Sequence, residues 1–234
     1  MKRFYKLVSF REDPEGYALL LDGKPIKTKA GQPLVAPSEL IANEAVQEWA
    51  NQGDVIDPDT MPITQILNTK IDRISIERNA MTRAILKYLD TDLLCYLADQ
   101  PKELAELQNK KWAQWRNWAE TKFGHTIETT SGIQALSQPA ELHQVIEKHV
   151  HDLDDNRFTI LQIIVPLSGS LILGLALVDG AVNATDVHEA CFVEEDFKDE
   201  LHNAEKYGTD PYTDKKRHAS LRDLKACAAY LNGC

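Results

Sequence analysis

The sequence has few of the features that mark a disulfide framework or a zinc site. Its 234 residues contain only four cysteines, at positions 95, 191, 227 and 234, and no C-x-x-C pair is present. That spacing is not typical of a structural zinc site, and the pattern is not that of a secreted disulfide scaffold. We therefore expect reduced thiols and a cytosol-like compartment.

An excess of positive charge is also missing. The chain carries 26 basic and 36 acidic residues, a net charge of −10. This balance excludes a general nucleic-acid binder, whose affinity comes from neutralising phosphates, and disfavours docking on an anionic membrane. The acid excess is local, because residues 141–210 hold 15 acidic and 4 basic residues. Charge concentrated in this way indicates a partner surface or a solubility device.

The short motifs of common enzyme classes are absent. The sequence contains no G-x-G-x-x-G, no G-x-x-x-x-G-K-[ST] and no G-x-S-x-G, so the dinucleotide, P-loop and nucleophile-elbow readings have no support. His188-Glu189 begins like a zinc-protease motif, but Phe192 stands where the second histidine ligand belongs. We predict that the protein is not an enzyme and has no catalytic residue, no metal and no cofactor.

A histidine-rich stretch supplies the alternative, a metal-dependent hydrolase. Three histidines stand near three aspartates: His143, His149, His151, Asp152, Asp154 and Asp155. On one helix His149 would lie about 120° to 160° away from the other two histidines, so the ligands converge only if the helix breaks. We therefore favour a solvated helix end at this position.

Only one long stretch lacks charge. Residues 158–178 are long enough to span a bilayer, but Pro166 to Ser170 predict a helix stop followed by a new N-cap. We predict two buried helices, at 155–165 and 170–179, and no membrane insertion.

The hydrophobic periodicity predicts an α+β fold, with a β-rich N-terminal domain at residues 1–75 and a mostly α-helical C-terminal domain at 76–234. Strands are expected at 4–10 and 17–28, around a turn at Asp22-Gly23. Ser38 should cap a helix, and its inner stripe should be Ile41, Ala45 and Trp49.

Further helices follow along the chain. The helix at 62–78 has an apolar face, and Gln65, Asn68 and Asp72 share the opposite side. Others are expected at 81–96, 101–123, 140–151, 186–201 and 216–231, with a small β excursion at 126–136. Trp112, Trp115 and Trp118 could stack single-stranded bases, but a stripe at helical spacing is more typical of core packing.

One acidic residue stands on an apolar stripe. On a helix at 186–201, Glu194 lies seven residues from both Val187 and Leu201, in the middle of the apolar face. A carboxylate in that place needs a partner within the chain or in another molecule, because burying an unpaired charge costs free energy. It could pair with Lys198 one turn along, or contact a partner that docks on this helix.

Several short motifs occur in a fixed order along nearly the whole chain. They are Arg3-Phe4-Tyr5-Lys6, Leu21-Asp22-Gly23-Lys24-Pro25, Glu48-Trp49, Met61-Pro62, Asn68-Thr69, Ile71-Asp72-Arg73, YLDTDLLCY at 88–96, Gln108 with Trp112, Ser168-Gly169-Ser170-Leu171 and Glu194-Glu195-Asp196-Phe197. This ordered set resembles the assembly-chaperone family for the F₁ head of ATP synthase, the factor that handles the F₁ alpha subunit.

The resemblance implies a function and a set of site residues. Such a protein has no catalytic centre; it binds the unassembled F₁ alpha subunit and shields its beta-facing surface until the hexamer assembles. Trp49 and the acidic pair Glu194-Glu195 match positions that matter in the family, and we add Asn68 and Asp72 as partner-binding candidates. We expect a monomer.

Two further points concern the cellular compartment and a difference from the family's usual sequence. The N-terminus lacks the apolar core of a secretory signal and the long Arg/Ser-rich stretch of a transit peptide, so we expect a bacterial cytoplasm, or a mitochondrial matrix if a presequence was removed. The family usually shows Trp-Gly after the acidic cluster, where this chain has His202-Asn203 or, after a short insertion, Tyr207-Gly208.

Overall fold

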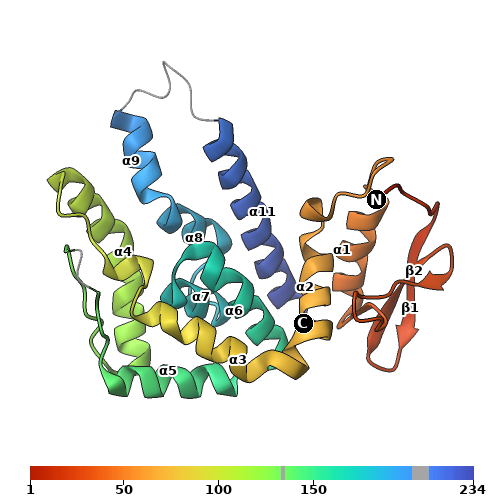
Figure 1. Cartoon of the computed structure of the whole chain (residues 1–234), viewed down its shortest axis with the longest axis horizontal. Helices are drawn as coiled ribbons and strands as arrows, with labels where there is room; N and C mark the ends of the chain where they lie inside the picture. The colour runs from red at the N-terminus through yellow and green to blue at the C-terminus, as the bar shows by residue number, and fades with distance from the viewer. Residues whose placement is uncertain (133–134, 202–210) are drawn as a thin grey trace. The chain divides into compact units, whose positions relative to one another are not determined.

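The computed structural model describes residues 1–132, 135–201 and 211–234 (Figure 1). It separates into two compact units. Unit 1 comprises Met1–Arg78, Asp155–Ile160 and Ala226–Cys234, and unit 2 comprises Asn79–Asp154 and Leu161–Lys225. A small antiparallel sheet near the N-terminus precedes a mostly helical chain. The α+β fold class predicted from the sequence is confirmed.

The sheet of unit 1 is built around one central strand. Its strands are β1 (Val8–Asp13), β2 (Gly16–Leu21), β3 (Lys24–Pro25) and β4 (Val35–Ala36), and β2 pairs antiparallel with each of the other three. Asp22 and Gly23 both have positive φ, 47° and 79°, the geometry of a two-residue hairpin turn. The predicted turn is therefore confirmed.

The predicted strand boundaries are partly wrong. β1 starts at Val8 and not at Phe4, because the chain before it bends toward the hairpin turn: the Leu7 N–H donates to Asp22 Oδ1 at 2.8 Å. Beyond β3 the ladder is reduced to an isolated bridge between Lys27 and Pro33.

Helix α1 (Glu39–Ala50) packs on β1 and β2 in unit 1. The Ser38 side chain accepts a hydrogen bond from the Ile41 N–H, as the sequence predicts for an N-cap. Ile41 and Ala45 are fully buried, which confirms two of the three residues in the predicted stripe. A short helical turn, η1 (Pro58–Thr60), leads to the second helix.

The helix predicted at 62–78 is present but contains a wide turn. It consists of α2 (Pro62–Thr69), the π-helical turn η2 (Lys70–Ile74) and α3 (Ser75–Leu86). The helix predicted at 81–96 is wrong beyond Leu86, where two short turns, η3 (Lys87–Leu89) and η4 (Leu93–Cys95), follow. The buried Asp92 side chain caps η4 and so redirects the chain there.

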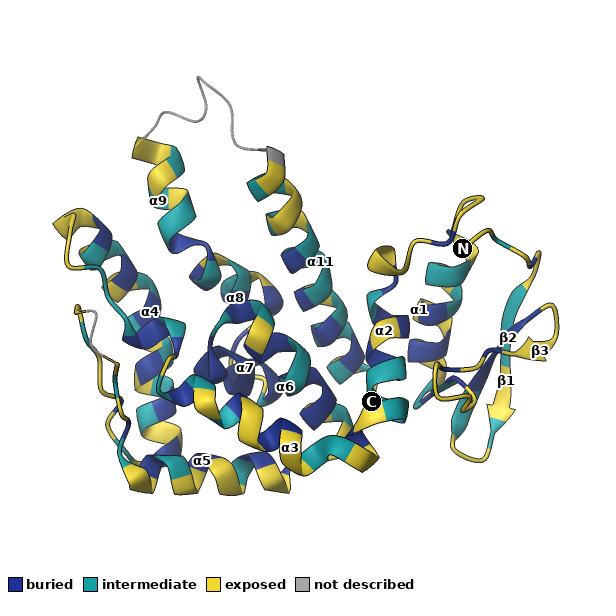
Figure 2. Ribbon diagram, in the orientation of Figure 1, coloured by how far each residue is buried: buried dark blue, intermediate teal, exposed yellow. Residues whose placement is uncertain are grey.

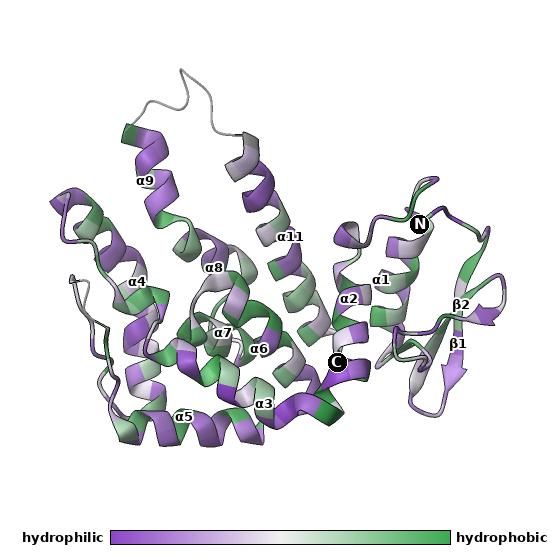
Figure 3. Cartoon of the chain, viewed as in Figure 1, coloured by the Kyte–Doolittle hydropathy of each residue, from purple (hydrophilic) through white to green (hydrophobic). Residues whose placement is uncertain are grey.

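The remaining helices form most of unit 2. They are α4 (Lys102–Phe123), α5 (Ala140–Asp152), α6 (Asp155–Ser168), α7 (Leu171–Val178), α8 (Ala184–Cys191), α9 (Val193–Leu201) and α11 (Pro211–Asn232). The first residues of α6 and the last residues of α11 belong to unit 1. All eight residues of α7 are buried (Figure 2), and α7 is almost uniformly apolar (Figure 3). In the described residues, no helix combines the length and the apolar character needed to cross a membrane.

Three helix predictions need correction. Pro166 does not stop α6, which continues to Ser168 and ends at Gly169, a residue with φ 69°; Ser170 then caps α7 as predicted. The helix predicted at 186–201 is broken, because α8 ends at the buried Phe192 and α9 starts afresh. The last helix begins at Pro211, earlier than predicted, since proline suits a first turn.

The β excursion predicted at 126–136 is also wrong. The described part of this stretch contributes a single isolated bridge, between Tyr96 and Thr130, and no strand.

Candidate functional site

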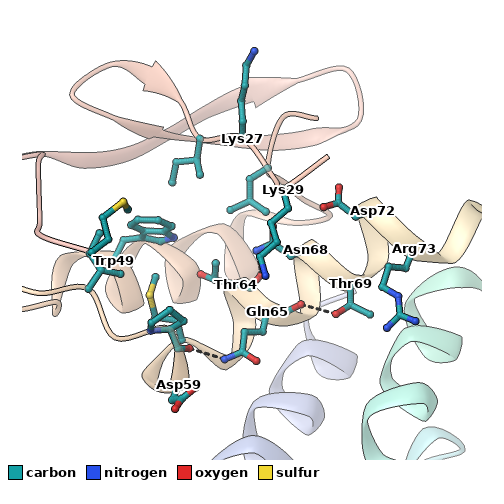
Figure 4. A pocket seen from close by; sticks show the side chains of 16 residues that line it. Lys27, Lys29, Trp49, Asp59, Thr64, Gln65, Asn68, Thr69, Asp72 and Arg73 are labelled. Atoms are coloured by element: carbon teal, nitrogen blue, oxygen red, sulfur yellow. Dashed lines mark hydrogen bonds between the residues drawn. The ribbon is translucent and has the colours of Figure 1, made fainter. Parts of the chain in front are cut away.

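A groove in unit 1 brings together three of the residues predicted to bind a partner. Trp49 from α1, Asn68 from α2 and Asp72 from η2 all line it (Figure 4). Its volume is about 760 Å³, within the range of ligand-binding cavities. Its apolar wall comes from the sheet side and from the turn before α2: Ile26, Leu34, Ile56 and Met61.

Glu48 fixes the two helices that frame this groove. Its carboxylate accepts the N–H groups of Ile63 at 2.6 Å and of Thr64 at 2.8 Å. Met61, at the N-cap of α2, gives no side-chain cap of its own, so Glu48 caps α2 from the neighbouring helix. Burial raises the pKa of the Glu48 carboxyl, and the hydrogen bonds from α2 work against this rise.

Trp49 is not the core residue that the helical stripe predicts. It is half-buried, because the space beside the last turn of α1 is the groove and not packed interior. Its ring meets Tyr5 edge to face at 5.6 Å, and its carbonyl accepts from the Tyr5 hydroxyl at 2.8 Å. Trp49 Nε1 is buried and has no hydrogen-bond partner among the described residues.

Asp72 reaches the groove from the π-helical turn. Its Oδ2 accepts the N–H of Ala30 at 3.1 Å, which ties the loop after β3 to the helix. Its Oδ1 is buried and, within the described residues, unpartnered. Asn68 donates to the carbonyl of Thr64 one turn earlier, at 2.8 Å. The sequence predicted that Asn68 and Asp72 share one face of their helix. In the structure both residues line the groove.

The sequence did not single out Lys29 as a residue of this site. Figure 4 shows Lys29 extending across the groove toward Gln65 and Asn68, whereas Lys27 points away. Lys29 reaches this place because the chain turns back at Gly31, with φ 83°. That approach depends on how the loop folds over α2, and no local pattern signals it.

The acidic pair on α9 lies in unit 2, and its two members differ. Glu194 is half-buried and accepts a hydrogen bond from Gln108 Nε2 on α4 at 2.9 Å. The contact therefore leads to another helix, whereas the sequence suggested Lys198 one turn along. Glu195, also half-buried, has no hydrogen-bond or ion-pair partner among the residues that the structure describes.

Two other acids of α9, Asp196 and Asp199, are engaged with α11. Arg217 bonds Asp196 at 2.8 Å and Asp199 at 2.8 Å. Glu194, Asp196 and Asp199 thus have partners inside the chain, whereas Glu195 is a half-buried acid of α9 without one among the described residues.

The three histidines of the alternative function, a metal-dependent hydrolase, do not converge on one site. His143 contacts Asp90 at 2.9 Å, His149 contacts Asp179 at 3.1 Å, and His151 lies 4.0 Å from Glu147. Each of the three imidazoles thus contacts a different carboxylate. In the described ranges, no group of three or more His, Cys, Asp or Glu residues could hold a metal ion.

Trp112 of the tryptophan stripe is a core residue. It is 1% exposed, and its Nε1 donates to the carbonyl of Ala190 at 2.9 Å. The positions that we compared with the family's Trp-Gly pair, His202-Asn203 and Tyr207-Gly208, lie outside the described residues.

Comparisons with known proteins agree with the fold and with the motifs. A family model described as ATP12 chaperone protein matches residues 2–120. Protein atp12, mitochondrial, of Schizosaccharomyces pombe is 24% identical over 195 residues, which cover 78% of this chain and 67% of the relative.

Two solved structures match almost the whole chain. The crystal structure of Atp12 from Paracoccus denitrificans has a TM-score of 0.84 and 31% identity, and the match covers 99% of this chain and 97% of that one. A crystal structure of a protein from Agrobacterium tumefaciens has a TM-score of 0.86 and 32% identity, over 99% of this chain and 85% of that one. The chain therefore belongs to the ATP12 chaperone family.

Proposed function

We propose that this protein is an assembly chaperone for the F₁ part of ATP synthase. It binds the unassembled F₁ alpha subunit and shields the surface that faces the beta subunit until the hexamer forms. The observation that carries the proposal is membership of the ATP12 chaperone family, supported by a structural match over 99% of this chain. The choice of the alpha subunit as the client rests on the resemblance of the ordered sequence motifs.

The physical requirements of such a chaperone differ from those of an enzyme. An unassembled subunit exposes apolar surface that would otherwise aggregate, and a protein that binds this surface lowers the concentration of the free form by mass action. Shape and polar complementarity suffice, and no reactive residue is needed. The separation of His143, His149 and His151 disfavours the metal-dependent hydrolase. We place the protein as a monomer in a bacterial cytoplasm or a mitochondrial matrix.

Glu195 is our candidate contact on α9. Its carboxylate is free of internal partners in the described chain, whereas Gln108 holds Glu194 in place. Figure 3 shows α9 as a mostly hydrophilic helix. A free carboxylate in an acidic stretch can steer a basic patch on the client and repel wrong partners. We assign the positioning role to Glu194 and the contact to Glu195.

A binding assay with purified F₁ alpha subunit tests this function. The expected result is a complex between the two proteins that fails to form when the alpha subunit is already assembled with beta. Glu195→Gln should weaken it, by about 1 kcal/mol or more at moderate salt. Glu200→Gln, on the exposed side of the same helix, is the matched control and should leave binding unchanged. Equal effects of both variants would reject the assignment to Glu195.

A further inference from the structure

Helix α9 in unit 2 is held in place mainly by polar side chains. Of its nine residues, all within the described chain, only Val193 is buried, so apolar packing contributes little to its position. The chain also breaks just before it, because Phe192 ends α8 with φ −109° and ψ 15°, away from the α-helical region. Since α9 does not continue α8, contacts with other helices must set its direction.

Arg217 on α11 contacts both the break and the helix that follows it. Its Nη1 lies 2.8 Å from Asp196 Oδ1, and its Nη2 lies 2.8 Å from Asp199 Oδ2. Its guanidinium carbon lies 5.4 Å from the centre of the Phe192 ring, within reach of a cation–π contact. The planar fork of an arginine can bridge two carboxylates, whereas the ammonium of a lysine is a point charge. One side chain therefore joins α11 to the break and to one side of α9.

The position of Arg217 is itself fixed against α8. Its side chain is 19% exposed, and its carbonyl oxygen lies 3.1 Å from His188 Nε2 on α8. The His188 ring lies over Phe192, with 4.7 Å between the ring centres. The guanidinium group is thereby tied to the end of α8, the place from which α9 departs.

Two anchors hold α9 on nearly opposite sides. Glu194 is held by Gln108 on α4 at 2.9 Å. At about 100° per residue, the midpoint between Asp196 and Asp199 lies about 170° from Glu194 around the helix axis. Glu195 lies about 100° from Glu194, on the side between the two anchors. Anchors on opposite sides fix the rotation of a helix about its axis, so the direction in which Glu195 faces depends on both.

We propose that Arg217 is the positioning residue of α9: it fixes the direction and the rotation of this helix, and so presents Glu195 to a partner protein. A carboxylate selects a basic patch only when its place is fixed, because electrostatic complementarity depends on register. The identity of the partner rests on the proposed chaperone function, whereas the position of α9 is a property of this chain alone.

Amide hydrogen exchange of the full chain tests the position of α9 without any partner. Arg217→Gln should accelerate exchange in α9 by roughly tenfold or more and leave α4 and α7 unchanged, because it frees one helix and not the whole of unit 2. Arg217→Lys should act in the same direction, since a lysine cannot bridge both carboxylates. Arg222→Gln is the matched control and should leave α9 unchanged, because Arg222 pairs with Asp223 on α11 itself, at 2.8 Å.

Binding of purified F₁ alpha subunit tests the effect on Glu195. Arg217→Gln and Glu195→Gln should each weaken the complex by roughly fivefold, and the double variant should be no weaker than Glu195→Gln alone. This non-additivity separates positioning from a general loss of stability, which would lower the affinity by the same factor in both backgrounds. Arg222→Gln should bind as the unmodified chain does.

Three results would overturn the inference. They are unchanged exchange of α9 in Arg217→Gln, equal acceleration throughout unit 2, and additive losses of affinity in the double variant. The exchange experiment contains no alpha subunit, so its failure would leave the proposed client intact. If the unmodified chain formed no complex with alpha subunit, the proposed client would be rejected instead, and the exchange data would decide whether Arg217 positions α9.

Discussion

Gln108 on α4 holds Glu194 on α9 through a hydrogen bond of 2.9 Å between residues 86 positions apart. The other end of the same amide accepts the N–H of Ala98 at 2.6 Å. Gln108 is fully buried, so a single side chain joins the acidic helix to α4 and to the loop before it. Residues from two separate sequence motifs, Gln108 and Glu194, thus form one structural link within unit 2.

Removing this amide should destabilise the protein. Gln108→Leu has a similar volume but leaves the Ala98 N–H and the Glu194 carboxylate without their partner, so we expect a loss of about 1–3 kcal/mol in the free energy of unfolding. Urea denaturation measures it. Gln114→Leu, on the exposed side of α4, is the matched control, with a change of roughly 0.5 kcal/mol or less. Equal losses in the two variants would show that the Gln108 link carries no stability.

The cap that Glu48 provides predicts a second stability effect. Glu48→Ala leaves the N–H groups of Ile63 and Thr64 unpaired at the start of α2, which should cost about 1–2 kcal/mol, the typical worth of an N-cap. Glu44→Ala is the control: it removes a carboxylate from the exposed face of α1, the helix that carries Glu48, and should change stability little. Thermal denaturation of both variants provides the comparison, and an unchanged melting temperature for Glu48→Ala would contradict the capping role.

Two tryptophans should respond differently to the same substitution. Trp112→Phe breaks the bond to the Ala190 carbonyl and leaves a gap in the core, so we expect a loss of about 2–4 kcal/mol. Trp49→Phe removes an N–H that has no internal partner in the described chain and should cost far less. Both are read from urea unfolding curves. A larger loss for Trp49→Phe would mean that its indole N–H is bonded within the folded chain.

Asp92 gives the stability a defined pH dependence. Burial raises the pKa of its carboxyl from 3.8 to about 6, although the N–H groups of Leu94 and Ile172 donate to it and oppose the rise. A raised pKa in the folded state means that the folded chain binds the proton more tightly than the unfolded chain does. The stabilisation from this group is therefore complete below about pH 4 and is lost as the pH rises through about 6.

The comparison with Asp92→Asn isolates this effect. Asparagine does not titrate, so the stability of the unmodified chain relative to the variant should fall by about 3 kcal/mol from pH 4 to above pH 6. Urea unfolding of both proteins across that range measures the difference. A difference that stays constant with pH would show that Asp92 titrates normally.

The sequence predicted those features that depend on neighbouring residues. Asp22-Gly23 gives its turn because both residues tolerate positive φ, and Ser38 and Ser170 cap their helices through N–H groups only three residues away. Helical periodicity found α4 and α5 for the same reason, since each presents one apolar face to the core.

Features that depend on distant contacts could not be predicted in this way. The turn η4 is capped by Asp92, whose carboxylate also accepts the N–H of Ile172, 80 residues later. Trp49 stands at a position of its helix that periodicity assigns to the core, but a loop from the sheet leaves a groove there. The partner of Glu194 is on another helix, so the pattern of α9 alone could only suggest a neighbour one turn away.

The most direct test of the proposed function is the binding of this purified chain to unassembled F₁ alpha subunit, measured beside beta subunit and beside assembled F₁. The account predicts a stable complex with free alpha subunit, none with beta or with the assembled hexamer, and a weaker complex for Glu195→Gln. Failure to bind free alpha subunit, or equal binding to beta, would contradict it.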